Sequence, residues 1–219
     1  MPRILPLILG ALLLIGGGAY YMSQNNGSIP GVSIAEAQTA DGEVELAPDM
    51  SLGDPDAPIT VIEYASFTCP HCANFHASVF QQLKENYIDT GKIHFINREV
   101  YFDRFGLWAG MVARCGGEMR YFGISDMIYT TQKDWIGSGE PQEVLENLRK
   151  MGRLAGMNDD QLNACLEDES LAQSMVAAYQ QNAEADGING TPSFIIDGEK
   201  YSNMNYEDFA AILDEKLSN

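Results

Sequence analysis

The chain has 219 residues, 45% of them hydrophobic, so it is long enough to bury a sizeable core and is not expected to be disordered as a whole. Its 13 Lys and Arg residues against 31 Asp and Glu residues give a net charge of -18. This charge disfavours nucleic acids and anionic membrane surfaces as partners, and we interpret it as a well-solvated surface.

The first 22 residues have the layout of an export signal. Arg3 precedes an apolar run that extends to Ile15, and small residues ending at Ala19 close it. Residues 1–22 are therefore predicted to be a signal peptide, cleaved after Ala19, or a signal anchor retained in the membrane, since the apolar stretch approaches the length of a bilayer span. Both outcomes export the protein, and we expect a periplasmic location, where disulfides persist.

Residues 23–48 show no apolar periodicity and are rich in Asn, Gly, Ser, Glu, Gln and Thr. This composition predicts a flexible linker without a fold of its own.

The folded part opens with a strand, a helix and a second strand. Residues 59–65 are mostly apolar on both faces, which is typical of a central strand. Apolar residues then recur at helical spacing from Pro70 to about Asp89, and residues 92–100 form a second apolar run. This order predicts two parallel strands joined by a helix.

Strand patterns then cease, and apolar stripes at helical spacing predict a helical block over residues 104–182. Ser138, Asn158 and Ser170 are the candidate amino-terminal caps of its later helices. Beyond the block, residues 193–201 with the central pair Asp197-Gly198 predict a β-hairpin, and a last helix is expected from about Tyr206.

The motif Cys69-Pro70-His71-Cys72 lies where the first strand gives way to the helix. At a helix start, unpaired backbone N–H groups and the peptide dipoles favour the thiolate of Cys69, and Pro70 is suited to the first turn. The dipole contributes at most about 2 kcal/mol, whereas each pKa unit requires about 1.4. Further donors are therefore needed, and backbone amides near Cys72 and a polarised or protonated His71 are the candidates.

A stabilised Cys69 thiolate favours the reduced pair, so the disulfide accepts electrons from a substrate dithiol. We expect the protein to act as an oxidant, with Cys72 shielded inside and attacking the mixed disulfide to release the substrate. The alternative for a C-x-x-C motif is half of a zinc site, but Cys115 and Cys165 lie far apart in sequence and supply no second close pair of ligands.

The segment from Val61 to Phe75, VIEYASFTCPHCANF, resembles the active-site segment of the DsbA family. The resemblance extends over about residues 49–219. It implies an α/β protein with a thioredoxin-like fold and an inserted α-helical domain, in which residues 49–103 and 183–219 form the thioredoxin-like domain and residues 104–182 the insertion. It also implies a protein thiol-disulfide oxidoreductase that needs no cofactor and no metal.

In thioredoxin-like folds, the proline before the penultimate strand is cis and faces the cysteine pair, and Pro192 matches it. A cis bond would free the backbone of Thr191 to bind an extended substrate strand. The alternative is an ordinary trans proline at the start of an edge strand. Many oxidants of the family carry a bulky aliphatic residue at the position of Thr191, whereas threonine recurs among isomerase-like relatives, so the direction of electron flow stays open.

Glu63 shares a strand face with Ile59 and Val61, which directs its carboxyl group into apolar surroundings. Burial raises the pKa of a carboxyl group, so Glu63 is a candidate proton relay for the Cys72 thiol. The alternative is a half-exposed carboxylate with a salt-bridge partner.

Cys115 and Cys165 each lie on an apolar helical stripe. They are either two inert buried thiols or a structural disulfide, and an oxidising compartment favours the disulfide. Some DsbA relatives carry such a bridge in the helical block and others have none.

The resemblance implies that the protein donates its disulfide to unfolded or reduced exported proteins and is reoxidised by a membrane quinone-linked partner resembling DsbB. We expect a monomer. Two alternatives remain: a reductase or isomerase for a narrower set of clients, and a non-catalytic chaperone that binds peptides around Pro192.

Overall fold

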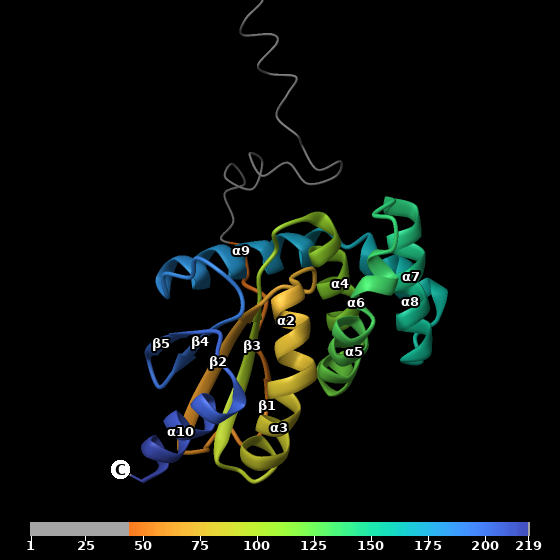
Figure 1. Cartoon of the computed structure of the whole chain (residues 1–219). Helices are drawn as coiled ribbons and strands as arrows, with labels where there is room; N and C mark the ends of the chain where they lie inside the picture. The colour runs from red at the N-terminus through yellow and green to blue at the C-terminus, as the bar shows by residue number, and fades with distance from the viewer. Residues whose placement is uncertain (1–43, 219) are drawn as a thin grey trace, which may run out of the picture. The chain divides into compact units, whose positions relative to one another are not determined.

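A five-stranded mixed sheet is the centre of the computed structural model, which describes residues 44–218 (Figure 1). The strand order is β1-β3-β2-β4-β5, and β2 and β3 are parallel, whereas the other neighbouring strands are antiparallel. The predicted strand, helix and parallel strand are thereby confirmed. The strands are β1 (Met50–Leu52), β2 (Ile59–Ala65), β3 (Ile93–Glu99), β4 (Ser193–Ile196) and β5 (Glu199–Ser202).

The helix between β2 and β3 is continuous from residue 70 to residue 88 but changes its pitch along the way. It consists of α2 (Pro70–Phe75), η1 (His76–Phe80), α3 (Gln81–Leu83) and η2 (Lys84–Ile88), and the two η segments are π-helical. Figure 1 shows α2 and α3 stacked end to end as one rod. Apolar spacing predicts the rod correctly, but it does not reveal the wider turns.

The two faces of the sheet are covered by different helices. Apolar residues of the α2–η2 rod and of α10 (Tyr206–Leu217) pack with the inward side chains of β2, β3 and β4 in one cluster. On the opposite face, Tyr64 and Ile195 pack against Tyr179 and Ala183 of α9 (Glu169–Ala185). The last helix before β4 therefore belongs to the sheet as much as to the helical block.

The helical block follows β3 and packs around a second apolar cluster. Together with the sheet and its covering helices, the block forms the thioredoxin-like fold with a helical insertion that the resemblance implies. The helices of the block that precede α9 are α4 (Arg104–Cys115), α5 (Glu118–Thr130), α6 (Gln132–Ile136), α7 (Pro141–Leu154) and α8 (Asp159–Leu166).

One of the three predicted helix caps is correct. Asn158 caps α8, and its side chain and that of Gln161 form a reciprocal capping box. Ser138 is not a cap, because Glu140 precedes α7 and Pro141 occupies its first turn. Ser170 is not a cap either, because the side chain of Asp168 accepts the backbone N–H of Leu171 and begins α9 two residues earlier.

The predicted hairpin turn is present between β4 and β5. Asp197 has a φ of 47° and Gly198 a φ of 81°, as a type I′ turn requires at both central positions. The Asp-Gly pair therefore determines this connection locally.

Residues 44–48 differ from the expected flexible linker. The backbone N–H of Ala47 donates to the Ser174 carbonyl at 3.2 Å, and the Pro48 carbonyl accepts from Arg114 Nη1 at 2.9 Å. Ala47 is buried in a cluster with residues of α4, α8 and α9, so the folded part begins earlier than residue 49. The predicted signal segment 1–22 and residues 23–43 of the linker lie outside the described residues. Between residues 44 and 218, no helix combines the length and apolar character that a bilayer span demands.

Candidate active site

The C-x-x-C motif forms the start of α2. Cys69 is the N-cap residue and Pro70 occupies the first turn of the helix. Cys69 is 9% exposed and Cys72 is fully buried, and both are free thiols. Pro70 and His71 between them are exposed. The sulfur of Cys69 is therefore the one that a partner protein reaches first.

The surroundings of Cys69 favour its thiolate. The Cys72 thiol donates to the Cys69 sulfur and lowers the pKa of Cys69 to about 5, although partial burial acts in the opposite direction. The backbone N–H groups of Cys72 and His71 add to this effect. His71 thus lowers the pKa of Cys69 through its backbone N–H. Backbone amides supply part of the thiolate stabilisation that the helix dipole alone cannot provide.

Cys72 has the opposite chemistry. Burial raises the pKa of its thiol far above the usual value, and the bond to Cys69 and the charge of Glu63 raise it further. At neutral pH, one sulfur of the pair is therefore an anion and the other keeps its proton. The two sulfurs of the pair therefore differ in both exposure and proton affinity.

The segment Thr191–Pro192, far from the cysteines in sequence, lies next to Cys69. The Thr191–Pro192 peptide bond is cis, and the Thr191 carbonyl oxygen lies 3.5 Å from Cys69 Sγ. The segment leads directly into β4, the strand next to β2. The backbone carbonyl of Thr191 thus lies beside the Cys69 sulfur.

Glu63 is buried beneath the cysteine pair. It is 1% exposed, so the half-exposed alternative does not hold. Burial raises the pKa of its carboxyl group to about 8, although a hydrogen bond from Asn97 lowers it in part. Its Oε2 accepts from Asn97 Nδ2 at 3.2 Å, and its Oε1 has no hydrogen-bond partner among residues 44–218. A buried acid with an unused oxygen can take or return one proton near neutral pH.

Sequence reasoning missed four residues that continue from Glu63 into the helical block: Asn97 and Glu99 of β3, Arg114 of α4 and Tyr121 of α5. Asn97 and Glu99 are each only 5% exposed, and Tyr121 is fully buried. The inward period-two positions of β3 could have revealed the two strand residues by the same argument that identifies Glu63. Tyr121 and Arg114 carry no such signal.

Gln132 is a second missed contact between the block and the site. This buried residue of α6 donates through Nε2 to the Phe67 carbonyl at 2.8 Å and to the Cys69 carbonyl at 3.0 Å. It therefore holds the turn that precedes α2. Its polar side chain on a short helix gives no hint of this role in the sequence.

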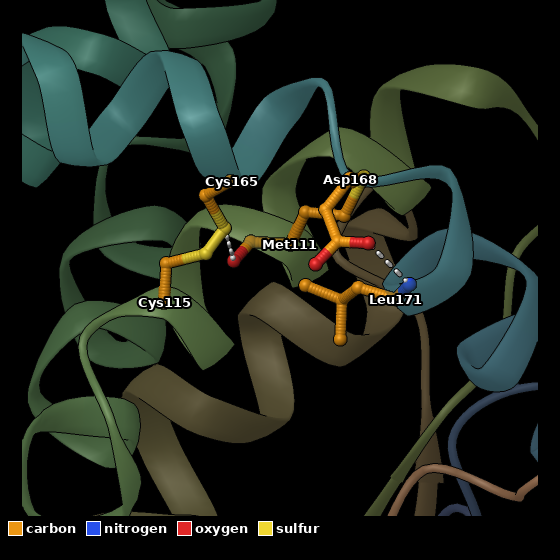
Figure 2. The surroundings of a disulfide bond; sticks show 5 residues. All are labelled: Met111, Cys115, Cys165, Asp168 and Leu171. Carbon is orange, nitrogen blue, oxygen red and sulfur yellow. Dashed lines mark hydrogen bonds between the residues drawn. A yellow bond between two sulfur atoms is a disulfide. The ribbon is translucent and has the colours of Figure 1, made fainter.

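Cys115 and Cys165 are joined in a disulfide that connects α4 to α8 (Figure 2). Their Cα atoms are 6.1 Å apart and the sequence separation is 50 residues. The Cys165 sulfur lies 3.3 Å from the Met111 carbonyl oxygen, and Asp168, also drawn in Figure 2, caps the next helix. The bridge thus belongs to the packing of the helical block. In the part of the chain that the structure describes, no three His, Cys, Asp or Glu side chains are grouped to hold a metal ion.

Comparisons with known proteins agree with this geometry. The thioredoxin family model matches residues 45–215. A Rickettsia bellii protein with the provisional name protein-disulfide oxidoreductase is 35% identical over 170 residues, which is 77% of this chain and 64% of that protein. The chain thus spans less than two thirds of this relative's length.

Solved structures agree as well. Wolbachia pipientis alpha-DsbA1 is 30% identical and superposes with a TM-score of 0.72, covering 80% of this chain and 94% of that one. Bacillus subtilis BdbD, at 18% identity and a TM-score of 0.70, covers 82% of this chain and 100% of its own and shares the fold. With the family match, the C-x-x-C helix start and the helical insertion, the chain belongs to the DsbA group of the thioredoxin family.

Proposed function

We propose that the protein is a thiol-disulfide oxidoreductase that donates a Cys69–Cys72 disulfide to reduced exported proteins. The observation that supports this direction is the opposite protonation of the two sulfurs. The pKa of Cys69 is lowered to about 5, which stabilises the reduced pair and makes its disulfide a strong electron acceptor.

The exchange runs in two balanced steps. A substrate thiolate attacks Cys69 Sγ, the bond between the two cysteine sulfurs breaks, and Cys72 leaves and takes a proton from Glu63. A second substrate thiolate then attacks the substrate sulfur of the mixed disulfide and expels the Cys69 thiolate. The substrate loses two electrons and the cysteine pair gains them. Attack by Cys72 on the mixed disulfide, the step expected from the sequence, runs the exchange backwards and releases the substrate unoxidised.

Each site residue has a role in this scheme. Cys69 is the attacked sulfur and Cys72 the buried partner, whereas Pro70 and the His71 backbone shape the helix start. Glu63 holds the proton that Cys72 needs. Thr191 and Pro192 bind the substrate as an added strand next to Cys69, which lies 3.5 Å from the Thr191 carbonyl oxygen.

The DsbA group implies the remaining partners. We infer a periplasmic protein, monomeric, whose reduced pair returns its electrons to a membrane partner resembling DsbB. The Cys115–Cys165 disulfide takes no part in the exchange, since it lies within the packing of two helices of the insertion.

Equilibration of the Cys69–Cys72 pair against glutathione tests the direction of electron flow. We expect a reduction potential above about -180 mV, the value of protein disulfide isomerase, whereas a reductase would lie near thioredoxin at about -270 mV. A value below about -200 mV would overturn the oxidase assignment. Cys69→Ala should abolish the oxidation of a reduced peptide, while a non-catalytic chaperone would retain its full peptide-binding activity in that variant.

A further inference from the structure

A chain of buried polar side chains leads from Glu63 into the helical insertion. Asn97 Nδ2 donates to Glu63 Oε2 at 3.2 Å, and the Tyr121 hydroxyl lies 2.8 Å from Asn97 Oδ1. The same hydroxyl lies 2.9 Å from Glu99 Oε1. Arg114 closes the chain, with Nε at 2.8 Å and Nη2 at 2.5 Å from the two oxygens of Glu99.

The hydroxyl of Tyr121 cannot satisfy both of its neighbours at once. It carries one proton, and burial raises the pKa of Tyr121 well above its usual value, so that proton stays in place. Both nearby oxygens, Asn97 Oδ1 and Glu99 Oε1, are acceptors in the present arrangement. Because the oxygen and nitrogen of an asparagine amide are distinguished only by their partners, a second arrangement has to be considered.

Two arrangements are open to the chain, and they differ in the protonation of Glu63 and in whether Tyr121 donates to Asn97 or to Glu99. When Glu63 is ionised, the Asn97 amide donates to it and Tyr121 donates to Asn97 Oδ1. When Glu63 carries a proton, it donates to Asn97 Oδ1 after the amide has turned over. Asn97 Nδ2 then donates to the Tyr121 oxygen, and the Tyr121 proton is directed at the Glu99 carboxylate.

We propose that the Asn97 amide is a two-position switch that turns over when Glu63 gains or loses a proton, and that Tyr121 and Glu99 define its two positions. The switch rests on the proposed function in one respect, namely that Glu63 exchanges a proton with Cys72. It makes Asn97 and Tyr121 positioning residues of the reaction, since each acts through Glu63 and touches no substrate.

The proton balance of the switch is local. One proton moves between Cys72 Sγ and Glu63, and no proton moves along the rest of the chain. Asn97 rotates about its terminal bond and the Tyr121 O–H changes direction, each keeping its own hydrogens. Glu99 retains its two bonds from Arg114 in both positions. Glu63 therefore finds a hydrogen-bond partner in either protonation state, which a general acid and base requires.

The groups around Glu63 determine which of the two arrangements of the Asn97 amide is favoured. Asn97 of β3 donates to Glu63, and Cys72 of α2 and Tyr129 of α5 interact with it electrostatically. Tyr121, Glu99 and Arg114 follow farther along the hydrogen-bonded chain. A hydrogen bond to a carboxylate is stronger than one to a neutral amide. The Glu99 carboxylate consequently attracts the Tyr121 proton and favours the arrangement in which Glu63 is protonated.

The test titrates Glu63 in the oxidised protein, where neither Cys69 nor Cys72 ionises. The Glu63 carboxyl carbon is followed by carbon-13 NMR, assigned with Glu63→Gln, and the Asn97 side-chain amide by nitrogen-15 NMR. We expect both signals to change with the same midpoint. An Asn97 amide signal that stays constant through the Glu63 midpoint would overturn the switch, and both titrations are recorded in the protein with its own sequence.

Tyr121→Phe tests whether Glu99, acting through Tyr121, favours the arrangement in which Glu63 is protonated. Tyr129→Phe is the matched control on the same helix. Loss of the Tyr121 hydroxyl should lower the Glu63 midpoint by up to about one pH unit, a tenfold loss of proton affinity. The control removes an uncharged hydroxyl that lies near Glu63 but is not part of the hydrogen-bonded chain, so it should shift the midpoint less than Tyr121→Phe does. An unchanged midpoint in Tyr121→Phe would contradict the role of Glu99. Failure of the oxidase proposal appears separately, as a low reduction potential with the titration intact.

Discussion

The two cysteine pairs of this chain have the same atoms and opposite chemistry. Cys69 and Cys72 are three residues apart at the start of one helix, beside a loop that presents the Thr191 carbonyl. Cys115 and Cys165 are 50 residues apart and join two helices inside the insertion. The first pair has a partly accessible sulfur with stabilising donors, and the second is packed among apolar residues.

This difference shows that surroundings decide whether a pair of cysteines acts as a reagent or as a structural link. A helix start lowers the pKa of a thiol and favours the reduced state. A bridge between distant helices restricts the unfolded chain and favours the oxidised state. Variants of the two pairs and of their surroundings separate these two roles.

Cys69→Ala should reduce the oxidation of a reduced peptide to the uncatalysed rate, because the attacked sulfur is gone. The matched double variant Cys115→Ala/Cys165→Ala should keep the wild-type rate at a temperature where it is folded. Rates measured side by side check both statements. Activity in Cys69→Ala would mean that another sulfur performs the exchange.

The same double variant should be less stable by up to about 4 kcal/mol, the value of the chain-entropy model for a loop of this length. Denaturant unfolding, with the Cys69–Cys72 pair kept reduced in both proteins, measures the difference. A loss below about 1 kcal/mol would show that the bridge restricts the unfolded state little.

The stability of the reduced protein should rise with pH relative to that of the oxidised protein. The pKa of Cys69 is lowered from 9.0 to about 5 in the folded state. The contribution of Cys69 to the free energy of unfolding is therefore complete above pH 9 and disappears as the pH falls to about 5. Between pH 5 and pH 7 the change should be at most about 3 kcal/mol, and less where solvent screens the sulfur. Unfolding of both forms across this range checks the sign, and a difference independent of pH would contradict the thiolate.

Gln132→Ala removes the donor to the Phe67 and Cys69 carbonyls and should cost about 2 kcal/mol, because the buried Phe67 carbonyl loses a partner. It should also raise the pKa of Cys69, measured by alkylation rate against pH, because the turn before α2 is released. Gln81→Ala, which removes an exposed amide bonded to Asp126, is the control and should leave both quantities unchanged.

The smallest effect is expected far from both pairs. Asn158→Ala removes the capping box of α8 and should lower stability by about 1 kcal/mol without changing the reactivity of Cys69. Ser138→Ala, at a position that caps no helix, provides the comparison. Equal losses in the two variants would contradict the cap assignment.

The sequence alone determined what depends on neighbours along the chain. A strand that ends just before Cys69, a proline in the next turn and apolar residues at helical spacing place the cysteine pair at a helix start, because these signals act within one or two turns. Strand alternation placed Glu63 inside, and the positive φ tolerated by Asp197-Gly198 defined the hairpin. The segment 61–75, which most closely resembles the DsbA active-site segment, contains the same signals.

Only the tertiary structure decided which distant groups surround that pair. Tyr121 reaches Asn97 from 24 residues away, Gln132 reaches the Cys69 carbonyl from 63, and Thr191 lies against Cys69 from 122. None of these contacts leaves a periodic signal, since each is a single side chain or carbonyl that becomes a neighbour when helices and sheet pack. The docking of residues 44–48 on α9 has the same cause: this segment is too short to show a periodic pattern, and Leu46 becomes partly buried and Ala47 buried only where the helices provide an apolar surface.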